Sequence, residues 1–189
     1  MTENEIVDIL KESGALLTGH FQLRSGLHSN QFFQAALLLQ YQDKAEVVCR
    51  HLAEKFAGEK ISAVISPAVG GLIVGQEVAR ALGCRAIFAD KEDGELVLKR
   101  GFSIAKGEKI LVAEDVVTKG GRVQQTIDLV RSKGGDVAGV AVIVDRSGGT
   151  ASFDVPKFES ALKLSLPTYD PAECPLCAEK LPIDRPGSK

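Results

Sequence analysis

The sequence predicts an α/β fold: a Rossmann-like parallel sheet flanked by helices, with a small N-terminal cap. Between residues 61 and 145, short apolar runs rich in β-branched residues alternate with segments of helical length. This alternation is typical of parallel, helix-covered sheets. The runs are apolar at consecutive positions, as expected of strands that are buried on both faces. With 189 residues, of which 44% are hydrophobic, the chain can build one domain with a sizeable core.

The first 42 residues are expected to form a helix followed by a cap segment. Thr2 and Glu5 have the spacing of a capping box, and Gly14 is placed to end the helix. Ala15–Leu39 contains glycines and alternating apolar residues, which predict short strands and turns outside the main sheet.

Residues 43–150 are expected to form the core. Its first helix covers Gln42–Ala57, with Asp43 as the expected N-cap and Gly58 as the stop. The expected strands are Ile61–Ser66, Arg85–Ala89, Lys109–Ala113 and Val137–Asp145, and the helices between them are Gly70–Leu82 and Gly121–Ser132. Ligands of such sheets bind beyond the C-terminal ends of the strands.

Two segments depart from this rhythm. Lys91–Arg100 is charged and contains Gly94, so we expect a mobile excursion with a short strand at Glu95–Leu98. Residues 151–189 are rich in proline. They are expected to add one strand near Leu162–Leu166 and then a tail that completes the cap.

Composition excludes several classes of protein. The formal net charge is −2, so there is no basic excess for sequence-independent binding of nucleic acid. No apolar run reaches the length of a transmembrane helix, and the acidic, amphipathic N-terminus lacks a signal-peptide pattern. These features predict a cytoplasmic protein that binds neither membranes nor nucleic acids.

The four cysteines are Cys49, Cys84, Cys174 and Cys177. The first two lie in apolar stretches and are expected to be small buried residues. The last two form a CxxC, which could supply half of a zinc site. A structural zinc site needs four ligands, however, no second CxxC is present, and the three histidines lie far away in the sequence. We therefore expect an unmetallated turn, and a redox role is weaker still.

The strongest chemical signal is Ile110–Arg122, which reads ILVAEDVVTKGGR. An apolar strand ends in Glu114 and Asp115, and a loop with Thr118 and two glycines then leads into a helix. Free N–H groups at a helix N-terminus bind phosphate, and glycines allow its close approach. The acids repel phosphate but suit ribose hydroxyls or a transient positive charge on the ribose. The pattern predicts a sugar-phosphate site, against the alternative of a solvated acidic loop.

Two common nucleotide motifs do not match. A P-loop requires GxxxxGK[ST], whereas here Thr-Lys-Gly-Gly follows two acids. A dinucleotide fingerprint requires GxGxxG, and Gly70, Gly71 and Gly75 give GGxxxG instead. The loop Ser66–Gly71 nevertheless lies between a strand and a helix, so it is a second candidate anion site, suited to pyrophosphate.

The segment ILVAEDVVTKGGR resembles the motif that binds 5-phosphoribosyl 1-pyrophosphate (PRPP) in type I phosphoribosyltransferases. Further segments resemble the orotate phosphoribosyltransferases in particular. These are His20–Ser29 with Phe32–Phe33, Pro67–Gly71, Asp145–Arg146, and the tail Leu166–Tyr169 with Cys174–Cys177. The resemblance covers nearly the whole chain. It implies transfer of ribose 5-phosphate from PRPP to orotate with Mg²⁺, giving orotidine 5′-monophosphate and pyrophosphate in pyrimidine biosynthesis.

The resemblance also implies roles by position. PRPP binding falls to Glu114, Asp115, Val116, Val117, Thr118, Lys119, Gly120, Gly121, Arg122, Lys91, Val69 and Gly70, and orotate binding to Thr118, Arg146, Phe32, Phe33 and Arg24. Asp115 and Lys91 are the expected catalytic residues, and no protein residue is a dedicated metal ligand because Mg²⁺ arrives with PRPP. An arginine fork matches the orotate carboxylate, although Arg146 alone could equally form a surface salt bridge. The alternative for both phenylalanines is an ordinary place in the core.

Lys91–Arg100 fits a lid that brings a cation to the departing pyrophosphate and excludes water. Lys91, Lys99 and Arg100 are the candidates, and a solvated hairpin is the alternative. In the family this loop reaches the neighbouring subunit, which implies a homodimer. The sequence departs from the family pattern in carrying Arg24 where lysine is usual and Asp90 where arginine is usual.

Two other functions remain open. A purine phosphoribosyltransferase would share the PRPP loop, but a neutral purine offers no carboxylate to Arg146. A PRPP-sensing regulator without catalysis would keep the same loop, but no DNA-binding appendage is evident in the sequence.

Overall fold

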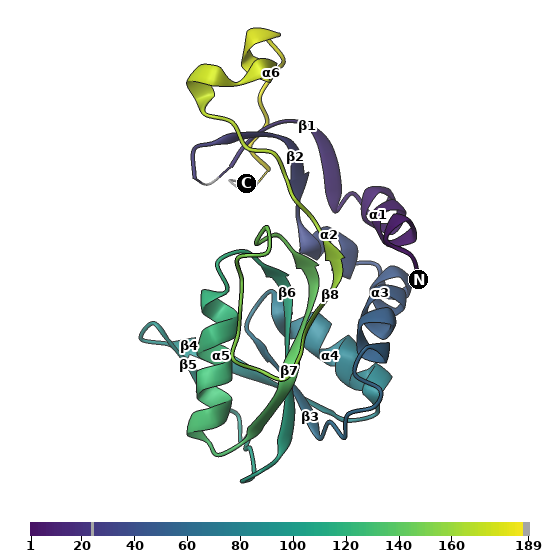
Figure 1. The fold of residues 1–189 in the computed structure, drawn as a ribbon, viewed down its shortest axis with the longest axis vertical. Helices are drawn as coiled ribbons and strands as arrows, with labels where there is room; N and C mark the ends of the chain where they lie inside the picture. Colours follow the sequence, from purple (N-terminus) through teal and green to yellow (C-terminus); the bar gives the residue numbers. More distant parts are fainter. Residues whose placement is uncertain (24, 187–189) are drawn as a thin grey trace.

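The computed structural model describes residues 1–23 and 25–186 (Figure 1). The N-terminal elements are α1 (Glu3–Glu12), β1 (Leu16–Gln22), β2 (His28–Phe33), α2 (Ala35–Leu39) and α3 (Gln42–Glu54). The central elements are β3 (Ala63–Pro67), α4 (Gly71–Leu82), β4 (Arg85–Glu92), β5 (Glu95–Leu98), β6 (Lys109–Val117), α5 (Gly121–Ser132) and β7 (Asp136–Asp145). The chain ends with β8 (Phe158–Lys163), a 3₁₀ turn η1 (Pro171–Glu173) and α6 (Pro175–Ala178).

A six-stranded sheet in the order β5-β4-β3-β6-β7-β8 forms the centre of the molecule. Its strands from β4 to β8 pair in parallel, and only the edge strand β5 is antiparallel, in a hairpin with β4. The predicted α/β fold with a mainly parallel sheet is therefore confirmed. Strands β1 and β2 form a separate antiparallel pair, as the sequence predicts for a cap outside the main sheet.

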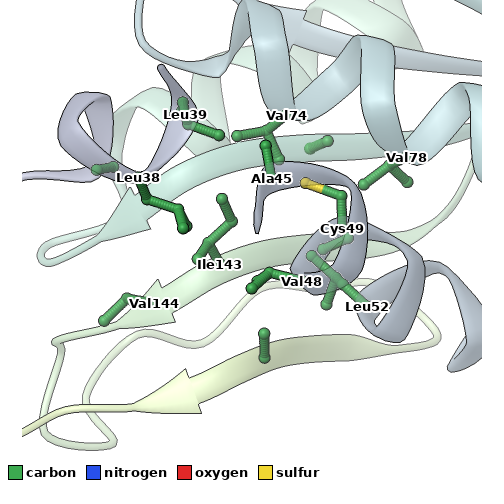
Figure 2. Packing of buried hydrophobic residues seen from close by; sticks show 14 of the residues in the cluster. Leu38, Leu39, Ala45, Val48, Cys49, Leu52, Val74, Val78, Ile143 and Val144 are labelled. Carbon is green, nitrogen blue, oxygen red and sulfur yellow. The ribbon is translucent and has the colours of Figure 1, made fainter. Parts of the chain in front are cut away.

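Helices cover both faces of this sheet (Figure 1). Alternate residues of each strand face opposite sides: Val64 and Leu111 pack in the cluster of α3 and α4, whereas Ile65 and Val112 pack in the cluster of α5. Figure 2 shows the first cluster, where Val48 and Leu52 of α3 meet Ile143 of β7. Burial on both faces explains why the strands are apolar at consecutive positions.

Several boundaries differ from the prediction. β6 continues past Ala113 to Val117, because its later residues pair with β7 as far as Asp145. β8 spans Phe158–Lys163 rather than Leu162–Leu166, since pairing with β7 sets its register. The short helix α2 was not foreseen in the cap.

The helix ends show which local sequence signals correctly predict where a helix begins or ends. The capping box of Thr2 and Glu5 is present at α1, and Gly83 ends α4 in the left-handed conformation with φ 70°. The prediction of Asp43 as an N-cap is wrong: Tyr41 precedes α3 as its N-cap, and Asp43 lies in the first turn. An acid in the first turn still favours the helix through the helix dipole.

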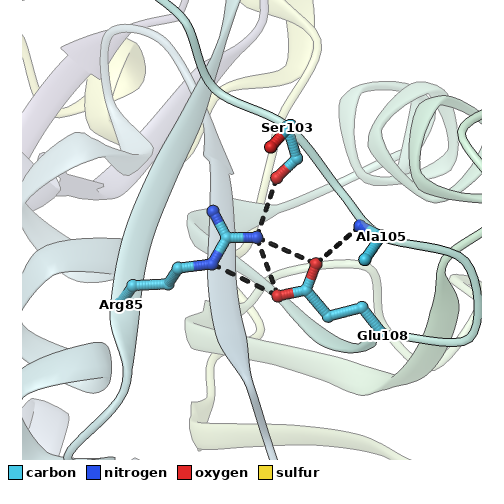
Figure 3. A network of polar contacts seen from close by, with 4 residues as sticks. All are labelled: Arg85, Ser103, Ala105 and Glu108. Atoms are coloured by element: carbon cyan, nitrogen blue, oxygen red, sulfur yellow. Dashed lines mark hydrogen bonds and ion pairs between the residues drawn. The ribbon is translucent and has the colours of Figure 1, made fainter.

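The end of the sheet opposite the predicted ligand site is closed by a polar network (Figure 3). Arg85, at the start of β4, donates to both carboxylate oxygens of Glu108 and to the carbonyl of Ser103. The Glu108 carboxylate also accepts the N–H of Ala105 at 2.8 Å. These bonds hold the 101–108 connection against the start of β4.

The tail returns to the N-terminal strand pair (Figure 1). His28 and Tyr169 exchange two backbone hydrogen bonds, and Asp184 bonds to the backbone of His20 and Gln22. Together β1, β2 and residues 167–184 form a small lobe beyond the main sheet. Within the described residues, no helix is long and apolar enough to cross a membrane.

Candidate active site at the carboxyl ends of the strands

Glu114 and Asp115 lie in the last part of β6, which extends beyond the strand expected at Lys109–Ala113. Pairing of β6 with β7 extends the strand through both residues. Glu114 is buried with 6% of its surface exposed, and Asp115 is half-buried. Each carboxylate accepts the N–H of the following residue, at 3.1 Å for Glu114 and 2.7 Å for Asp115. The two acids are thus held rigidly where β6 ends.

Burial and then the neighbouring Asp115 carboxylate raise the pKa of Glu114 from 4.5 to about 8. Removal from water disfavours the charged form, and a like charge does the same. A buried acid pair of this kind gains stability from hydroxyl donors or positive charge. A ribose diol would supply hydroxyl donors to these carboxylates, and a cation or a developing oxocarbenium ion would supply positive charge.

Glu114→Gln is expected to change how the free energy of unfolding depends on pH. The folded protein holds the Glu114 proton more tightly than the unfolded chain does, so this contribution is fully present below pH 4.5 and is lost as pH rises through about 8. Urea titrations without substrate are expected to show a gain for Glu114→Gln that grows to about 1–3 kcal/mol near pH 8. The exposed Glu95→Gln serves as the control, and a Glu114→Gln gain that is the same at every pH contradicts the assignment.

The glycines after β3 allow the chain to pass directly against these acids. A Cβ at Gly70 would lie 2.8 Å from Oδ2 of Asp115, and a Cβ at Gly71 would lie 2.9 Å from Oε1 of Glu114. Only glycine fits such close approach. The predicted PRPP residue Gly70 is therefore brought beside the predicted catalytic Asp115. Gly71 is an equally tight neighbour; it belongs to the expected anion loop Ser66–Gly71 but is not one of the residues assigned to PRPP.

Gly71→Ala is expected to lower the free energy of unfolding by about 1–3 kcal/mol, because the added methyl would meet Glu114, Ser66 and the backbone of Ala113 within 3.3 Å. At an open position the same change is neutral to stabilising. Gly58→Ala is the matched control, since nothing lies within 4 Å of its Cβ position. Equal urea midpoints for the two variants would contradict the packing of this loop on the acids.

The loop after β6 has the form of an anion site. Thr118 and Lys119 are exposed, whereas Val117 is buried and Val116 is half-buried. Gly120 has a φ of 76°, and a Cβ at this position would lie 2.8 Å from the ring of Phe153. A side chain is therefore excluded there. Gly121 then starts α5, which presents its first N–H groups toward this loop.

Two loops meet at this end of the sheet. Nη1 of Arg122, in the first turn of α5, donates to the carbonyl oxygen of Ala68 at 3.1 Å. That bond joins the loop after β6 to the loop after β3, where Val69 is 80% exposed and the Ala68–Val69 peptide is cis. The predicted phosphate loop and the predicted pyrophosphate loop are therefore neighbours.

Arg146 directly follows β7, which is the strand next to β6 in the sheet. Its backbone N–H donates to the carbonyl of Val117 at 2.8 Å, which places it beside Thr118. Burial lowers the pKa of its guanidinium. Within the described residues the buried Nε has no hydrogen-bond partner. A buried, unpaired guanidinium nitrogen is costly unless a ligand pairs it. Arg146 forms none of the salt bridges found within residues 1–23 and 25–186, so the surface ion pair that the sequence left open is not seen there.

The remaining orotate candidates lie on or near the small lobe. Phe33 is 5% exposed within the cluster of α1, α2 and α3, which favours an ordinary core role for it. Phe32 is half-buried, and its ring centroid lies 5.7 Å from that of Phe21. Arg24 lies outside the described residues, so its position stays a prediction.

The predicted lid is a hairpin made by the end of β4 and by β5 at the sheet edge. Lys99 pairs with Glu92 at 2.7 Å, and Arg100 pairs with Asp90 at 3.1 Å. Two of the three expected lid cations therefore have acidic partners within the hairpin. Lys91 is exposed, and it remains the candidate for contact with pyrophosphate.

A cavity of about 580 Å³ lies elsewhere, between the N-terminus of α1, β8 and the loop after β7. Asp145 reaches it, but the residues that line it include none of the 114–122 segment. This cavity is separate from the candidate active site, which is defined by the two acids, the glycines and Arg146 at the strand ends.

The phosphoribosyl transferase domain family matches residues 38–159, which include both acids, both loops and Arg146. An orotate phosphoribosyltransferase of Pelotomaculum thermopropionicum is 51% identical over 189 residues, covering 100% of this chain and 99% of the relative. The chain belongs to the orotate phosphoribosyltransferase family. The recognition of the family from sequence is therefore confirmed.

Solved structures agree with the fold. The crystal structure of orotate phosphoribosyltransferase from Aeropyrum pernix superimposes with a TM-score of 0.71 at 27% identity, covering 84% of this chain and 93% of that chain. Adenine phosphoribosyltransferase from Thermoanaerobacter pseudethanolicus matches with a TM-score of 0.62 at 19% identity, covering 71% of this chain and 88% of that chain. The second likeness shows the fold alone, so the acceptor base has to be argued from residues rather than from architecture.

Proposed function

We propose that this protein transfers ribose 5-phosphate from PRPP to orotate, giving orotidine 5′-monophosphate and pyrophosphate in pyrimidine biosynthesis. The observation that carries the choice of acceptor is Arg146. Its buried Nε has no hydrogen-bond partner among the described residues, and its backbone N–H bonds to Val117, directly before the loop that begins at Thr118. The planar guanidinium fork suits a carboxylate, and orotate carries one.

The PRPP loops supply the donor side of the reaction. The 5′-phosphate is proposed to lie on the N–H groups from Val116 to Arg122, and the pyrophosphate on Val69 and Gly70. The two acids would hold the ribose hydroxyls. The bond from ribose C1 to pyrophosphate oxygen breaks with its electron pair leaving on pyrophosphate. The orotate ring nitrogen forms the new bond to C1 and releases its proton to the departing pyrophosphate or to water. Asp115 stabilises the positive charge that develops on the ribose between these events.

Mg²⁺ fits this arrangement because the available protein groups are carboxylate oxygens, which hard divalent cations prefer. Glu114 and Asp115 are the residues of this chain that would lie nearest to it, and Mg²⁺ would be held mainly by PRPP. When bound, it neutralises charge on pyrophosphate. Positive charge near Glu114 would also oppose the rise in the pKa of this acid.

The lid and the oligomeric state are part of the same proposal. Lys91 is proposed to contact pyrophosphate after the β4–β5 hairpin closes, and the hairpin is proposed to serve the active site of the second subunit in a homodimer. The hairpin projects at the free edge of the sheet, beyond its pairing with β3. A cytoplasmic location is proposed for the same enzyme.

The test is a spectrophotometric assay of orotate consumption by the full chain with PRPP and Mg²⁺. We expect turnover that depends on all three. Turnover of adenine or hypoxanthine in place of orotate would support the purine alternative. Binding of PRPP without turnover of any base would support a sensor.

A further inference from the structure

Two histidines and two cysteines from distant parts of the chain meet in the small lobe. His20 lies on β1, His28 begins β2, and Cys174 and Cys177 lie at the N-cap and within α6. One donor atom from each lies within 4.8 Å of the other three. The sequence favoured an unmetallated CxxC because the histidines are far away along the chain. That reason does not hold in space, because the tail folds back on β1 and β2.

We propose that this His/Cys cluster (His20, His28, Cys174, Cys177) binds a structural zinc ion. Two imidazole nitrogens and two thiolates form one of the usual tetrahedral ligand sets of structural zinc. The proposal does not depend on which base the enzyme accepts, because the cluster lies on the small lobe and includes none of the residues assigned to PRPP or orotate.

The separations of the donor atoms fit a single ion. Zn–N bonds of about 2.0–2.1 Å and Zn–S bonds of about 2.3 Å place tetrahedral ligand atoms roughly 3.3–3.8 Å apart. Nε2 of His20 lies 3.0 Å from Nδ1 of His28, and Sγ of Cys177 lies 3.3 Å from the same Nδ1. The sulfurs of Cys174 and Cys177 lie 3.6 and 3.7 Å from Nε2 of His20. These distances leave space for an ion of zinc's size after shifts of a few tenths of an ångström.

The hydrogen bonding of His20 prepares it as a ligand. Its Nδ1 lies 2.9 Å from the carbonyl oxygen of Leu181. A carbonyl oxygen only accepts, so Nδ1 carries the proton and Nε2 of the neutral ring presents a lone pair to the cluster. Such a bond on the far side of the ring is the usual way in which proteins orient a histidine toward a metal.

Burial also matches a metal site. His20, His28 and Cys174 are 5%, 6% and 3% exposed, whereas Cys177 is exposed. Three ligands are therefore shielded from water, and the fourth leaves an entry path for the ion.

The tail adds little apolar burial to the lobe. Among the described residues after Leu162, Cys174 is the only buried one. Backbone bonds join His28 to Tyr169 and Asp184 to His20, but such bonds contribute little without an apolar core. A zinc ion that joins β1, β2 and α6 would replace that core. It would also fix the hairpin that carries Phe32, one of the residues proposed to border orotate.

The first test is the metal content of the purified full-length protein. We expect about one zinc ion per chain by plasma mass spectrometry. Cys177→Ser and His28→Gln are expected to lower zinc affinity by at least about 10–100-fold, the loss that follows even when only a group orienting a ligand is changed. The matched controls Cys84→Ser and His51→Gln alter a cysteine and a histidine outside the cluster and are expected to keep full zinc.

The second test uses the unaltered chain, in case the variants fail to fold. Zinc is removed with a chelator and Co²⁺ is added. Thiolate-to-cobalt charge-transfer bands together with the intense visible bands of tetrahedral cobalt are expected. Proteolysis of the tail is expected to become faster after chelation and to slow again when zinc is returned.

Four results would overturn the proposal. They are less than about a tenth of a zinc ion per chain after incubation with zinc, unchanged zinc in Cys177→Ser, a disulfide between Cys174 and Cys177 in the purified protein, and stoichiometric iron in place of zinc. Each measurement is made on metal or sulfur, so its outcome is separate from whether the enzyme turns over orotate.

Discussion

Arg146→Ala is expected to raise the KM for orotate by about 100-fold or more, which corresponds to roughly 3 kcal/mol, and to change the KM for PRPP by less than about threefold. Arg146 follows β7, and its backbone N–H bonds to Val117 of β6. Its buried Nε has no hydrogen-bond partner among the described residues. A carboxylate of the substrate would complete its hydrogen bonding. Steady-state kinetics with each substrate varied in turn provide the measurement.

Two further variants sharpen the result for Arg146. Arg146→Lys keeps the charge but loses the planar fork, so it is expected to give an intermediate KM for orotate. The exposed Arg50→Ala is the control and is expected to leave both KM values unchanged. If Arg146→Ala raises the two KM values equally, the guanidinium does not bind the carboxylate of the acceptor base. The choice of orotate then loses its main support.

Asp115→Asn is expected to lower kcat by about 10²–10³-fold. The substitution preserves the shape of the side chain, and its amide oxygen can still accept the N–H of Val116, as the carboxylate does at 2.7 Å. The charge is therefore removed while the geometry is kept. Because that charge is proposed to stabilise the ribose as pyrophosphate leaves, its loss should appear in kcat rather than in KM for PRPP alone.

The exposed Asp136→Asn, at the start of β7 and the opposite end of the sheet, serves as the control and is expected to retain normal kcat. A rise in KM for PRPP with kcat within about threefold of the unaltered enzyme would show that Asp115 only binds the ribose hydroxyls in the ground state. That outcome would remove Asp115 from the catalytic step and leave it as a binding residue.

Much of the fold could be predicted because its signals are local. Apolar β-branched runs predict β3, β4, β6 and β7 at close to their observed places, and Gly83 ends α4 where expected. The boundaries that failed are those set by pairing. β6 runs on through Glu114 and Asp115 because β7 is beside it, and no local signal distinguishes such a strand end from a loop.

The candidate site divides in the same way. The order of acids, threonine and glycines along residues 110–122 predicts a sugar-phosphate site by itself. The local conformational preferences of the residues do not predict, however, that Gly70 and Gly71 approach the two acids. Nor do they predict the hydrogen bond from Arg122 to Ala68 or the core position of Phe33. These features depend on how loops from different strands meet.

The sequence by itself determined the α/β fold and predicted a sugar-phosphate loop at residues 110–122. Its resemblance to the family added PRPP as the donor and Arg146 as the candidate for a substrate carboxylate. Only the tertiary structure decided that Glu114 is buried enough for its pKa to rise, that Nε of Arg146 has no partner in the described chain, and that His20 and His28 meet Cys174 and Cys177. The physical reason is distance along the chain. Hydrophobic periodicity and turn chemistry act over a few residues, whereas burial, unpaired charge and metal geometry arise where segments as distant along the chain as His20 and Asp184 come into contact.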